Sequence, residues 1–256
     1  MPLVETEAIV LRSYRLAEAD KIVSIFTRLM GRVRAVASGA QRTKSRYGGT
    51  LESLGYVRLW FYERENRDLV RLNSVEIIES FFDLQKDYAV HLAGQYLVEV
   101  SERLLPEREA SERTFRLLLA VLRNLKRFRE VDRPLAYFNY WILRLGGFLP
   151  DLTHCSGCGR IFEDETVHYA AALPGLYGRE CRQQLSAAAG TIASRSVAEV
   201  QAACAMPLDN WMIAPYKPHG INQVRDCFES MVEAQTERKL VTRSLLAEVT
   251  QETRLP

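Results

Sequence analysis

The sequence predicts a multidomain α+β chain in which a small N-terminal β-barrel precedes a helical region that is interrupted by a cysteine-bearing segment. The first 80 of the 256 residues contain five short runs rich in strand formers. From Phe82 onward, apolar residues recur at helical spacing instead. A CxxCG motif at Cys155–Gly159 marks the interruption. A chain longer than the usual ~100–150 residues of one domain is expected to form two or three packed units.

The predicted strands are separated by turns of glycine and small polar residues. They span residues 6–13, 22–27, 31–37, 56–62 and 68–78. The third strand alternates with period two. One face carries Val33, Ala35 and Ala37, and the opposite face carries Arg32, Arg34 and Val36. Five short strands in about 80 residues suit a small closed or partly open barrel. Residues 38–49, which are small, polar and basic, should form a mobile surface loop.

Three helices are predicted between residues 82 and 147. The first follows an apolar stripe and ends near Pro106; the stripe comprises Leu84, Tyr88, Leu92, Tyr96, Leu97, Val100 and Leu104. The second begins near Ser111 and the third runs from Leu135 to Leu145, before two glycines that suit a C-terminal cap. These apolar stripes indicate the main hydrophobic core.

The remaining chain is expected to be irregular over residues 151–190 and helical over 196–205, 220–235 and 236–248. The predicted domains are therefore a barrel at 1–80, a helical domain at 81–150, a zinc-ribbon-like insertion at 151–190, and a C-terminal helical segment at 191–256 that packs on the helical domain.

Positive charge is concentrated near the N-terminus, although the net charge is only +2. Residues 1–50 hold nine Lys/Arg against four Asp/Glu, whereas residues 51–150 hold fifteen of each and 151–256 hold ten against thirteen. Between Arg32 and Arg46 there are five basic residues and no acidic one. Such a basic field is typical of a surface that binds a polyanion. The alternative is a solvated face that acidic residues from elsewhere in the chain balance.

Three of the five cysteines are candidate metal ligands. Cys155 and Cys158 form a CxxCG knuckle, a tight turn that can present two thiolates to one tetrahedral metal. Cys181 supplies a third thiol, but Gln184 stands where a zinc ribbon has its fourth cysteine. Two outcomes stay open, a bound structural zinc and a knuckle that persists as a packed turn without a stable metal.

His168 is the better candidate for a fourth ligand, because His154 adjoins Cys155 and shared coordination would be awkward. Nothing in the sequence identifies the general base or open position that a catalytic zinc needs. Cys204 and Cys227 lie on predicted helical faces and are expected to be buried small apolar residues. The odd cysteine count argues against a disulfide framework.

No enzyme is predicted, and no catalytic residue is assigned. The sequence contains neither a P-loop, a GxGxxG turn, an HExxH motif nor a GxSxG elbow, and its four histidines are scattered. No run of about 18 uncharged apolar residues suggests a membrane span. The N-terminal residues lack a signal-peptide core, so we expect a cytoplasmic protein.

Several stretches of the sequence together match the pattern of one known family. The most specific are Glu7–Arg12, Glu18–Val23, Phe26–Ala40 and the basic loop Arg42–Gly49. The helical middle, the Gly146–Pro150 turn into the knuckle, and Glu237–Leu246 also contribute. These stretches resemble the RecO family of bacterial DNA repair proteins, and the resemblance spans nearly the whole chain.

The resemblance implies that the N-terminal barrel is an OB-fold and that the insertion is related to one that has four cysteines in many relatives. It implies a recombination mediator that binds single- and double-stranded DNA, anneals complementary strands, and works with RecR to help load RecA onto strands covered by single-strand-binding protein. The acidic C-terminal tail of that protein would dock on the helical domain, where the local basic residues are Arg116, Arg123, Lys126, Arg127 and Arg129. Such a protein would be nucleoid-associated.

Nine basic residues are the candidate DNA contacts. They are Arg12, Arg15, Lys21, Arg28, Arg32, Arg34, Arg42, Lys44 and Arg46. Five engaged cations would make log K fall with log salt at a slope of roughly −3.5 to −4.5. Tyr47, Trp60 or Tyr62 are candidates for stacking on bases, although packing is the commoner role of such side chains.

Two other functions stay open at this point. One is an RNA-binding OB-fold protein without annealing activity, because OB-folds do not distinguish the strands they bind. The other is an unrecognised phosphodiester hydrolase, although the carboxylates show no clustering typical of such a site.

Overall fold

The computed structural model describes residues 3–16, 18–62, 69–186, 189–236 and 238–252. The chain divides into two compact units, residues 1–126 and 127–256. Among the described helices, none is long and apolar enough to cross a bilayer. The finer division into domains at residues 80, 150 and 190 stays a prediction.

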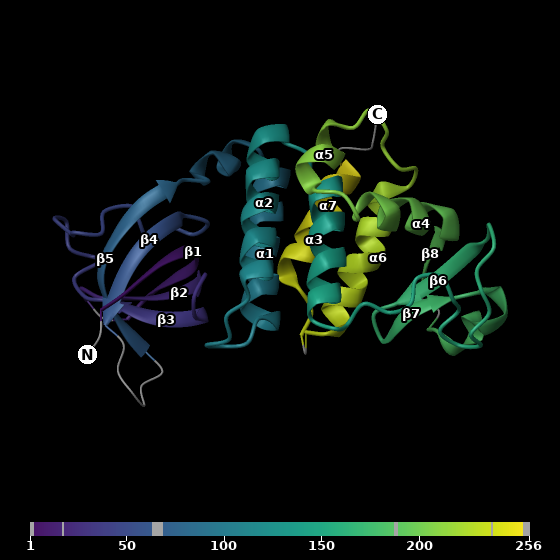
Figure 1. Ribbon diagram of the computed structural model, residues 1–256, viewed down its shortest axis with the longest axis horizontal. Coiled ribbons are helices and arrows are strands. Elements are labelled where there is room, and N and C mark those ends of the chain that lie inside the picture. The colour runs from purple at the N-terminus through teal and green to yellow at the C-terminus, as the bar shows by residue number, and fades with distance from the viewer. Residues whose placement is uncertain (1–2, 17, 63–68, 187–188, 237, 253–256) are drawn as a thin grey trace. The chain divides into compact units, whose positions relative to one another are not determined.

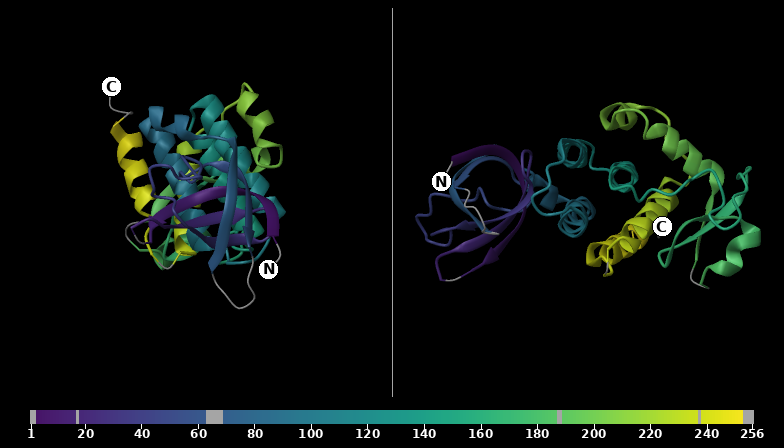
Figure 2. Two further views of the ribbon diagram at one scale, coloured as in Figure 1. Left: turned by 90° about the vertical axis from the view of Figure 1, so that its left-hand side faces the viewer. Right: turned by 60° about the horizontal axis from the view of Figure 1, so that its bottom comes forward.

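Five strands form a closed barrel at the start of the first unit (Figure 1). They are β1 (Leu3–Arg15), β2 (Lys21–Thr27), β3 (Gly31–Ala37), β4 (Tyr56–Tyr62) and β5 (Leu69–Glu79). The order is β1-β2-β3-β5-β4, and β1 pairs antiparallel with both β2 and β4. The parallel β3–β5 pair completes the ring, which the right-hand view of Figure 2 shows around a closed interior. The predicted five-stranded OB-like barrel is confirmed.

Alternating side chains fill the barrel. Along β3, Val33, Ala35 and Ala37 are buried, whereas Arg34 is exposed, as the period-two pattern predicts. The inward residues of all five strands form one apolar cluster, to which Tyr47 and Leu51 of the β3–β4 segment also belong.

A short 3₁₀ helix, η1 (Phe82–Lys86), and two helices, α1 (Tyr88–Leu104) and α2 (Glu112–Phe128), follow the barrel. The Asp87 side chain caps α1 by accepting from the amide of Val90 at 3.1 Å. The predicted start of the second helix is confirmed, because Ser111 Oγ accepts from the amide of Thr114. From α2, the Phe115 ring lies 5.9 Å from that of Phe26 on β2.

The loop between α1 and α2 crosses the turn that begins β3. The amide of Arg108 donates to the carbonyl of Arg32 at 2.9 Å. The approach is so close that a Cβ on Gly31 would lie 2.0 Å from the carbonyl oxygen of Glu109. Gly31 also has φ +68, so both space and backbone conformation require glycine there.

The second unit combines helices with a small sheet. Its elements are α3 (Asp132–Leu145), β6 (Thr166–Ala170), β7 (Leu173–Tyr177), η2 (Arg179–Gln184), β8 (Gly190–Ala193), α4 (Ser194–Ala203), α5 (Leu208–Ile213), α6 (Ile221–Ala234) and α7 (Val241–Glu252). The sheet order is β7-β6-β8. Helix α6 packs against α3, where the rings of Tyr140 and Phe228 lie 6.1 Å apart.

A buried ionic cluster ties α3, α6 and α7 together. The Arg225 side chain is 1% exposed and donates to Asp132 of α3 at 2.8 Å. Glu229 lies 3.4 Å from Arg225 and 3.9 Å from Arg243 of α7. Burial, together with the carboxylates of the cluster, raises the pKa of Glu229 to about 7 despite the two guanidinium groups.

Parts of the predicted secondary structure are wrong. Residues 151–190 are not irregular throughout, because they contain β6, β7 and η2. Helix α5 was not predicted, and the last helix begins at Val241 rather than at residue 236. Tyr88, placed on the buried stripe of α1, is 59% exposed because it lies in the first turn, whereas Leu92, Tyr96 and Val100 are buried. Predicted residues Asp68 and Glu237 lie outside the described residues.

Replacing Gly31 with alanine should lower the free energy of unfolding. The left-handed backbone alone costs an alanine ~1–2 kcal/mol. The loss should be well above this value, because the alanine Cβ would also collide with the backbone of Glu109. Urea unfolding followed by circular dichroism measures the loss. Gly39→Ala is the matched control, since φ is +75 there but the nearest atom is a side-chain carbon at 3.6 Å. Equal losses in the two variants would contradict the close approach.

Replacing Glu229 with glutamine should flatten the pH dependence of stability. Because the folded-state pKa is raised from 4.5 to about 7, the folded protein holds a proton that the unfolded chain releases. The stability from this group is therefore complete below pH 4.5 and is lost as the pH rises through 7. Between pH 5.5 and 8, wild type should lose about 2 kcal/mol more than the variant. Urea unfolding at a series of pH values measures this difference. If the free energy of unfolding changes with pH in the same way in wild type and variant, the proposed role of Glu229 is ruled out.

Candidate nucleic-acid interface and cysteine cluster

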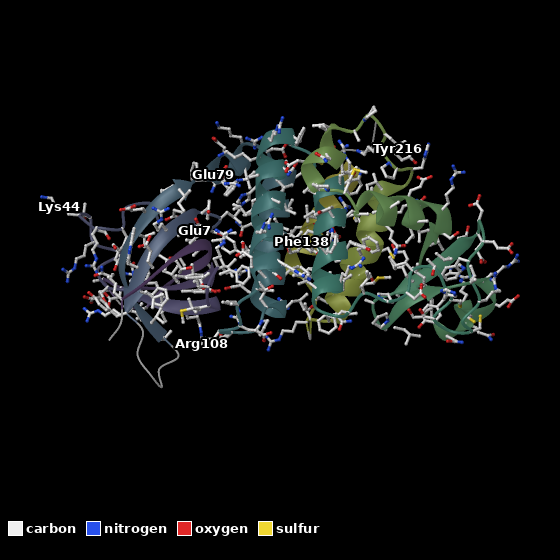
Figure 3. The ribbon with its side chains drawn as sticks, viewed as in Figure 1. Glu7, Lys44, Glu79, Arg108, Phe138 and Tyr216 are labelled. Atoms are coloured by element: carbon white, nitrogen blue, oxygen red, sulfur yellow. The ribbon has the colours of Figure 1, made fainter. Side chains whose placement is uncertain are left out.

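The segment between β3 and β4 presents three exposed cations. Arg42, Lys44 and Arg46 lie in its turns, and Lys44 projects from the barrel on the side away from α1 and α2 (Figure 3). No carboxylate among the described residues pairs with Arg42 or Lys44. Arg15, at the end of β1, is exposed in the same way and also lacks an acidic partner within the described part of the chain. These cations are available to phosphates.

Tyr47 fixes this segment to the barrel. Its side chain is 1% exposed, and its hydroxyl donates to the carbonyl of Leu72 at 3.0 Å. Arg46 lies 5.0 Å above the ring centroid and donates to the hydroxyl oxygen at 2.8 Å. Tyr47 therefore packs in the core, which was the commoner of its two expected roles.

Arg32 and Arg34 are already paired with a carboxylate. Glu107, in the loop between α1 and α2, lies 3.2 Å from Arg32 and 3.3 Å from Arg34. Arg32 also donates to the carbonyl of Leu105 at 3.0 Å, and its side chain is only 18% exposed. These two arginines hold the loop on the barrel.

Three other candidates also have acidic partners. Arg28 donates to Glu7 and to Glu112, and its guanidinium lowers the pKa of the Glu112 carboxyl. Arg12 lies 3.1 Å from Glu102 of α1, and Lys21 lies 3.9 Å from Glu52. The structure thus divides the nine candidates into five with acidic partners and the four exposed cations Arg15, Arg42, Lys44 and Arg46.

The remaining aromatic candidates lie on the outer face of β4. Trp60 and Tyr62 are half-buried and alternate with the buried Leu59 and Phe61. Arg58 shares their face. A stacking role for Trp60 and Tyr62 stays a prediction.

Arg123 and Lys126 of α2 face the same carboxylate. Arg123 lies 2.9 Å and Lys126 3.4 Å from Glu79 at the end of β5. Arg127 lies over the ring of Phe128, and Arg129 has φ 54 just beyond the helix. Arg116 interacts with Glu112. Binding of an acidic peptide tail by these residues stays a prediction.

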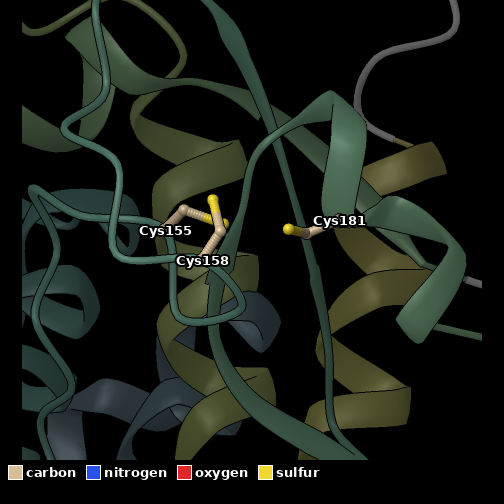
Figure 4. A group of neighbouring side chains, drawn as sticks. All are labelled: Cys155, Cys158 and Cys181. Atoms are coloured by element: carbon tan, nitrogen blue, oxygen red, sulfur yellow. The ribbon is translucent and has the colours of Figure 1, made fainter.

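The three clustered cysteines converge on one point, although Cys155 and Cys158 are remote in sequence from Cys181. Their sulfur atoms all lie within 4.8 Å of one another. Figure 4 shows the sulfur of Cys181 facing those of the knuckle. The sulfurs of a tetrahedral zinc site with bonds of ~2.3 Å lie about 3.8 Å apart, so this spacing suits three corners of such a site.

Backbone amides surround the Cys155 sulfur. Burial raises the pKa of the Cys155 thiol, but hydrogen bonds from the amides of Gly178, Cys158 and Gly157 outweigh it and bring the pKa down to about 7. The hydrogen bond to Cys158 and burial raise the pKa of Cys181 to about 11. As expected, Cys204 and Cys227 are fully buried, and burial raises the pKa of both thiols.

The Gln184 side chain lies close to that of Cys181. In the 3₁₀ helix η2, side chains three residues apart eclipse, so Gln184 lies on the same face as Cys181. The position of a Cβ on Gly157 is 2.9 Å from Cys181 Sγ and 3.0 Å from Gln184 Nε2. His168 does not belong to the group of converging ligands among the described residues. Its pKa is lowered mainly by burial and also by the nearby charge of Arg182. The three cysteines could therefore hold a metal ion, and the carboxamide of Gln184 lies near them.

Two features of these sites were missed from the sequence. The acidic partners Glu7, Glu102, Glu107 and Glu112 come from β1, from α1 and α2, and from the loop between these helices, and no local pattern links them to the basic residues. A cavity beside α1, lined by both polar and apolar side chains, was also missed. Its lining residues come from three separate stretches of the chain, 49–55, 77–85 and 91–95, which no local sequence pattern connects.

Two family models match the chain. The model described as "Recombination protein O N terminal" matches residues 1–81, and "Recombination protein O C terminal" matches residues 85–244.

Curated proteins named "DNA repair protein RecO" are also similar to the chain. The protein of Koribacter versatilis (strain Ellin345) is 38% identical over 95% of this chain and 98% of its own length. The protein of Symbiobacterium thermophilum is 34% identical over 72% of this chain and 73% of its own length. The protein of Anaeromyxobacter sp. (strain K) is 27% identical over 97% and 98%.

Proposed function

Since the chain belongs to the RecO family of DNA repair proteins, we propose that it acts without catalysis, as a mediator that binds single- and double-stranded DNA. The observation that carries this proposal is the group of exposed cations Arg42, Lys44 and Arg46 on the anchored β3–β4 segment. Cations without acidic partners attract phosphates and release the counterions that surround nucleic acid.

The further steps extend this binding. The protein would anneal complementary strands by neutralising both backbones, which needs phosphate contacts and no base readout. With RecR it would help load RecA onto strands covered by single-strand-binding protein, whose acidic tail would dock on the helical part of the chain. A cytoplasmic, nucleoid-associated location belongs to the same proposal.

Changing Arg42, Lys44 and Arg46 together to alanine should weaken the binding of a labelled single-stranded oligonucleotide. Because three phosphate contacts would be lost, the slope of log K against log salt should become shallower by about 2. Fluorescence anisotropy across a salt series measures this slope.

The matched control changes Arg32 and Arg34 to alanine. Since Glu107 already pairs with both arginines, this variant should keep a slope within about 0.7 of wild type, the contribution of one contact. A wild-type slope in the triple variant would remove the β3–β4 segment from the DNA site. Equal affinity for RNA and DNA without annealing would favour an RNA-binding protein instead.

The cysteine cluster supports a second, structural proposal, a zinc ion held by Cys155, Cys158 and Cys181. The backbone amides on Cys155 fit this role, because amide–sulfur hydrogen bonds stabilise a coordinating thiolate. The fourth position would fall to the carboxamide oxygen of Gln184 or to water. Carboxamides are poor zinc ligands, so this site should hold zinc less tightly than four thiolates would.

Replacing Gln184 with cysteine should therefore tighten zinc binding by about 100-fold or more, which exceeds the 10- to 100-fold effect of outer-shell changes. Competition with a chromogenic chelator measures the affinity, and thermal unfolding with and without zinc provides a second readout. Cys158→Ser in the Gln184→Cys background is the control and should reverse the gain. No gain in the Gln184→Cys variant would show that residue 184 is not at the fourth corner.

A further inference from the structure

A cavity of about 320 Å³ opens in the first unit, between the end of the β3–β4 segment, the end of β5 and the start of α1. Its volume is at the lower end of the ~300–1,000 Å³ range of small-molecule sites, so it suits one small planar group. It lies outside the β2–β3 face that OB-folds commonly use for nucleic acids.

The cavity carries hydrogen-bonding groups but no positive charge. Gln85 and Gln95 each offer a carboxamide with both donors and acceptors. His91 lines the same cavity, and its Nδ1 is buried without a hydrogen-bond partner among the described residues. No lysine or arginine lines the cavity, whereas Glu52 does, so it is unsuited to a phosphate.

Apolar side chains complete the site. Leu54 and Phe81 are buried, whereas Phe82 is 64% and Ile77 51% exposed. An aromatic ring that stands in water beside a cavity with carboxamides matches the two properties of a nucleobase, a flat π-face and a polar edge.

The chain connects this cavity directly to the exposed cations. Gly49 and Thr50, which line the cavity, follow Arg46 by only a few residues in the same segment. We propose that this cavity captures one unstacked base of a single DNA strand whose phosphates lie along Arg42, Lys44 and Arg46. The proposal rests on the proposed function, since it names a second contact of the same DNA site. Phe82 would stack on the base, and Gln85, His91 and Gln95 would meet its edge.

The test compares the intact Phe82→Ala variant with wild type on two labelled oligonucleotides of equal length. One carries all its bases, and the other carries abasic sugars with the same number of phosphates. Loss of a stacking contact should weaken binding of the base-bearing strand by about tenfold and leave the abasic strand unaffected. Tyr88→Ala is the matched control, because Tyr88 is 59% exposed and close in sequence but does not line the cavity.

A second variant, Gln85→Ala, keeps the Phe82 ring. It should bind the base-bearing strand more weakly than wild type does and bind the abasic strand equally well. Circular dichroism confirms that each variant is folded, which the exposure of Phe82 and Gln85 favours. If both variants bind the base-bearing strand as wild type does, while binding still falls with salt, the base site is overturned and DNA binding stands. If wild type binds neither strand, both proposals fall.

Discussion

The hydrogen bond from the buried Tyr47 hydroxyl to the carbonyl of Leu72 fixes the segment on which both candidate binding surfaces depend. Upstream of Tyr47 the segment carries exposed cations, and downstream it forms a wall of the cavity. Backbone hydrogen bonds between Val10 and both Leu54 and Gly55 hold its end against β1. A turn-rich connection, which has no strand or helix ladder of its own, thereby acquires a defined position through one aromatic side chain and a few backbone bonds.

The distribution of charge in space differs from its distribution in the sequence. Residues 1–50 have a large cationic excess, yet Arg28, Arg32 and Arg34 lie beside glutamates from the helices and their connecting loop. Exposed ion pairs contribute little stability, typically ~0–1 kcal/mol each. They place a negative charge beside the arginines of β3, whereas no carboxylate among the described residues pairs with Arg42 or Lys44 of the β3–β4 segment. Counting charge along the chain locates the basic region but not the cations that are free to bind.

The sequence predicts the barrel well and the second unit less well, for physical reasons. Strand β3 alternates with period two because one face meets the core, and glycine or polar turns bound each strand. Strand β7 has no such pattern, and its Pro174 argues against a strand. However, β7 lies at the edge of its sheet, where a proline can be placed without the loss of a hydrogen bond to a neighbouring strand. Helix α5 has six residues, too few to show a helical period. The cysteine knuckle was recognisable locally, whereas its convergence with Cys181 depends on the sheet between them.

The two contacts proposed for the β3–β4 segment would respond differently to salt, and this bears on how a mediator could exchange strands. Phosphate contacts weaken as salt rises, because each released counterion gains less entropy when it enters a more concentrated solution. Stacking of a base beside Phe82 exchanges no counterion, so its share of the affinity grows with salt. A strand held by both contacts would release its phosphates first and keep one base seated. Because a captured base is unavailable for pairing while its neighbours remain free, such a site holds a strand without blocking the annealing of the rest.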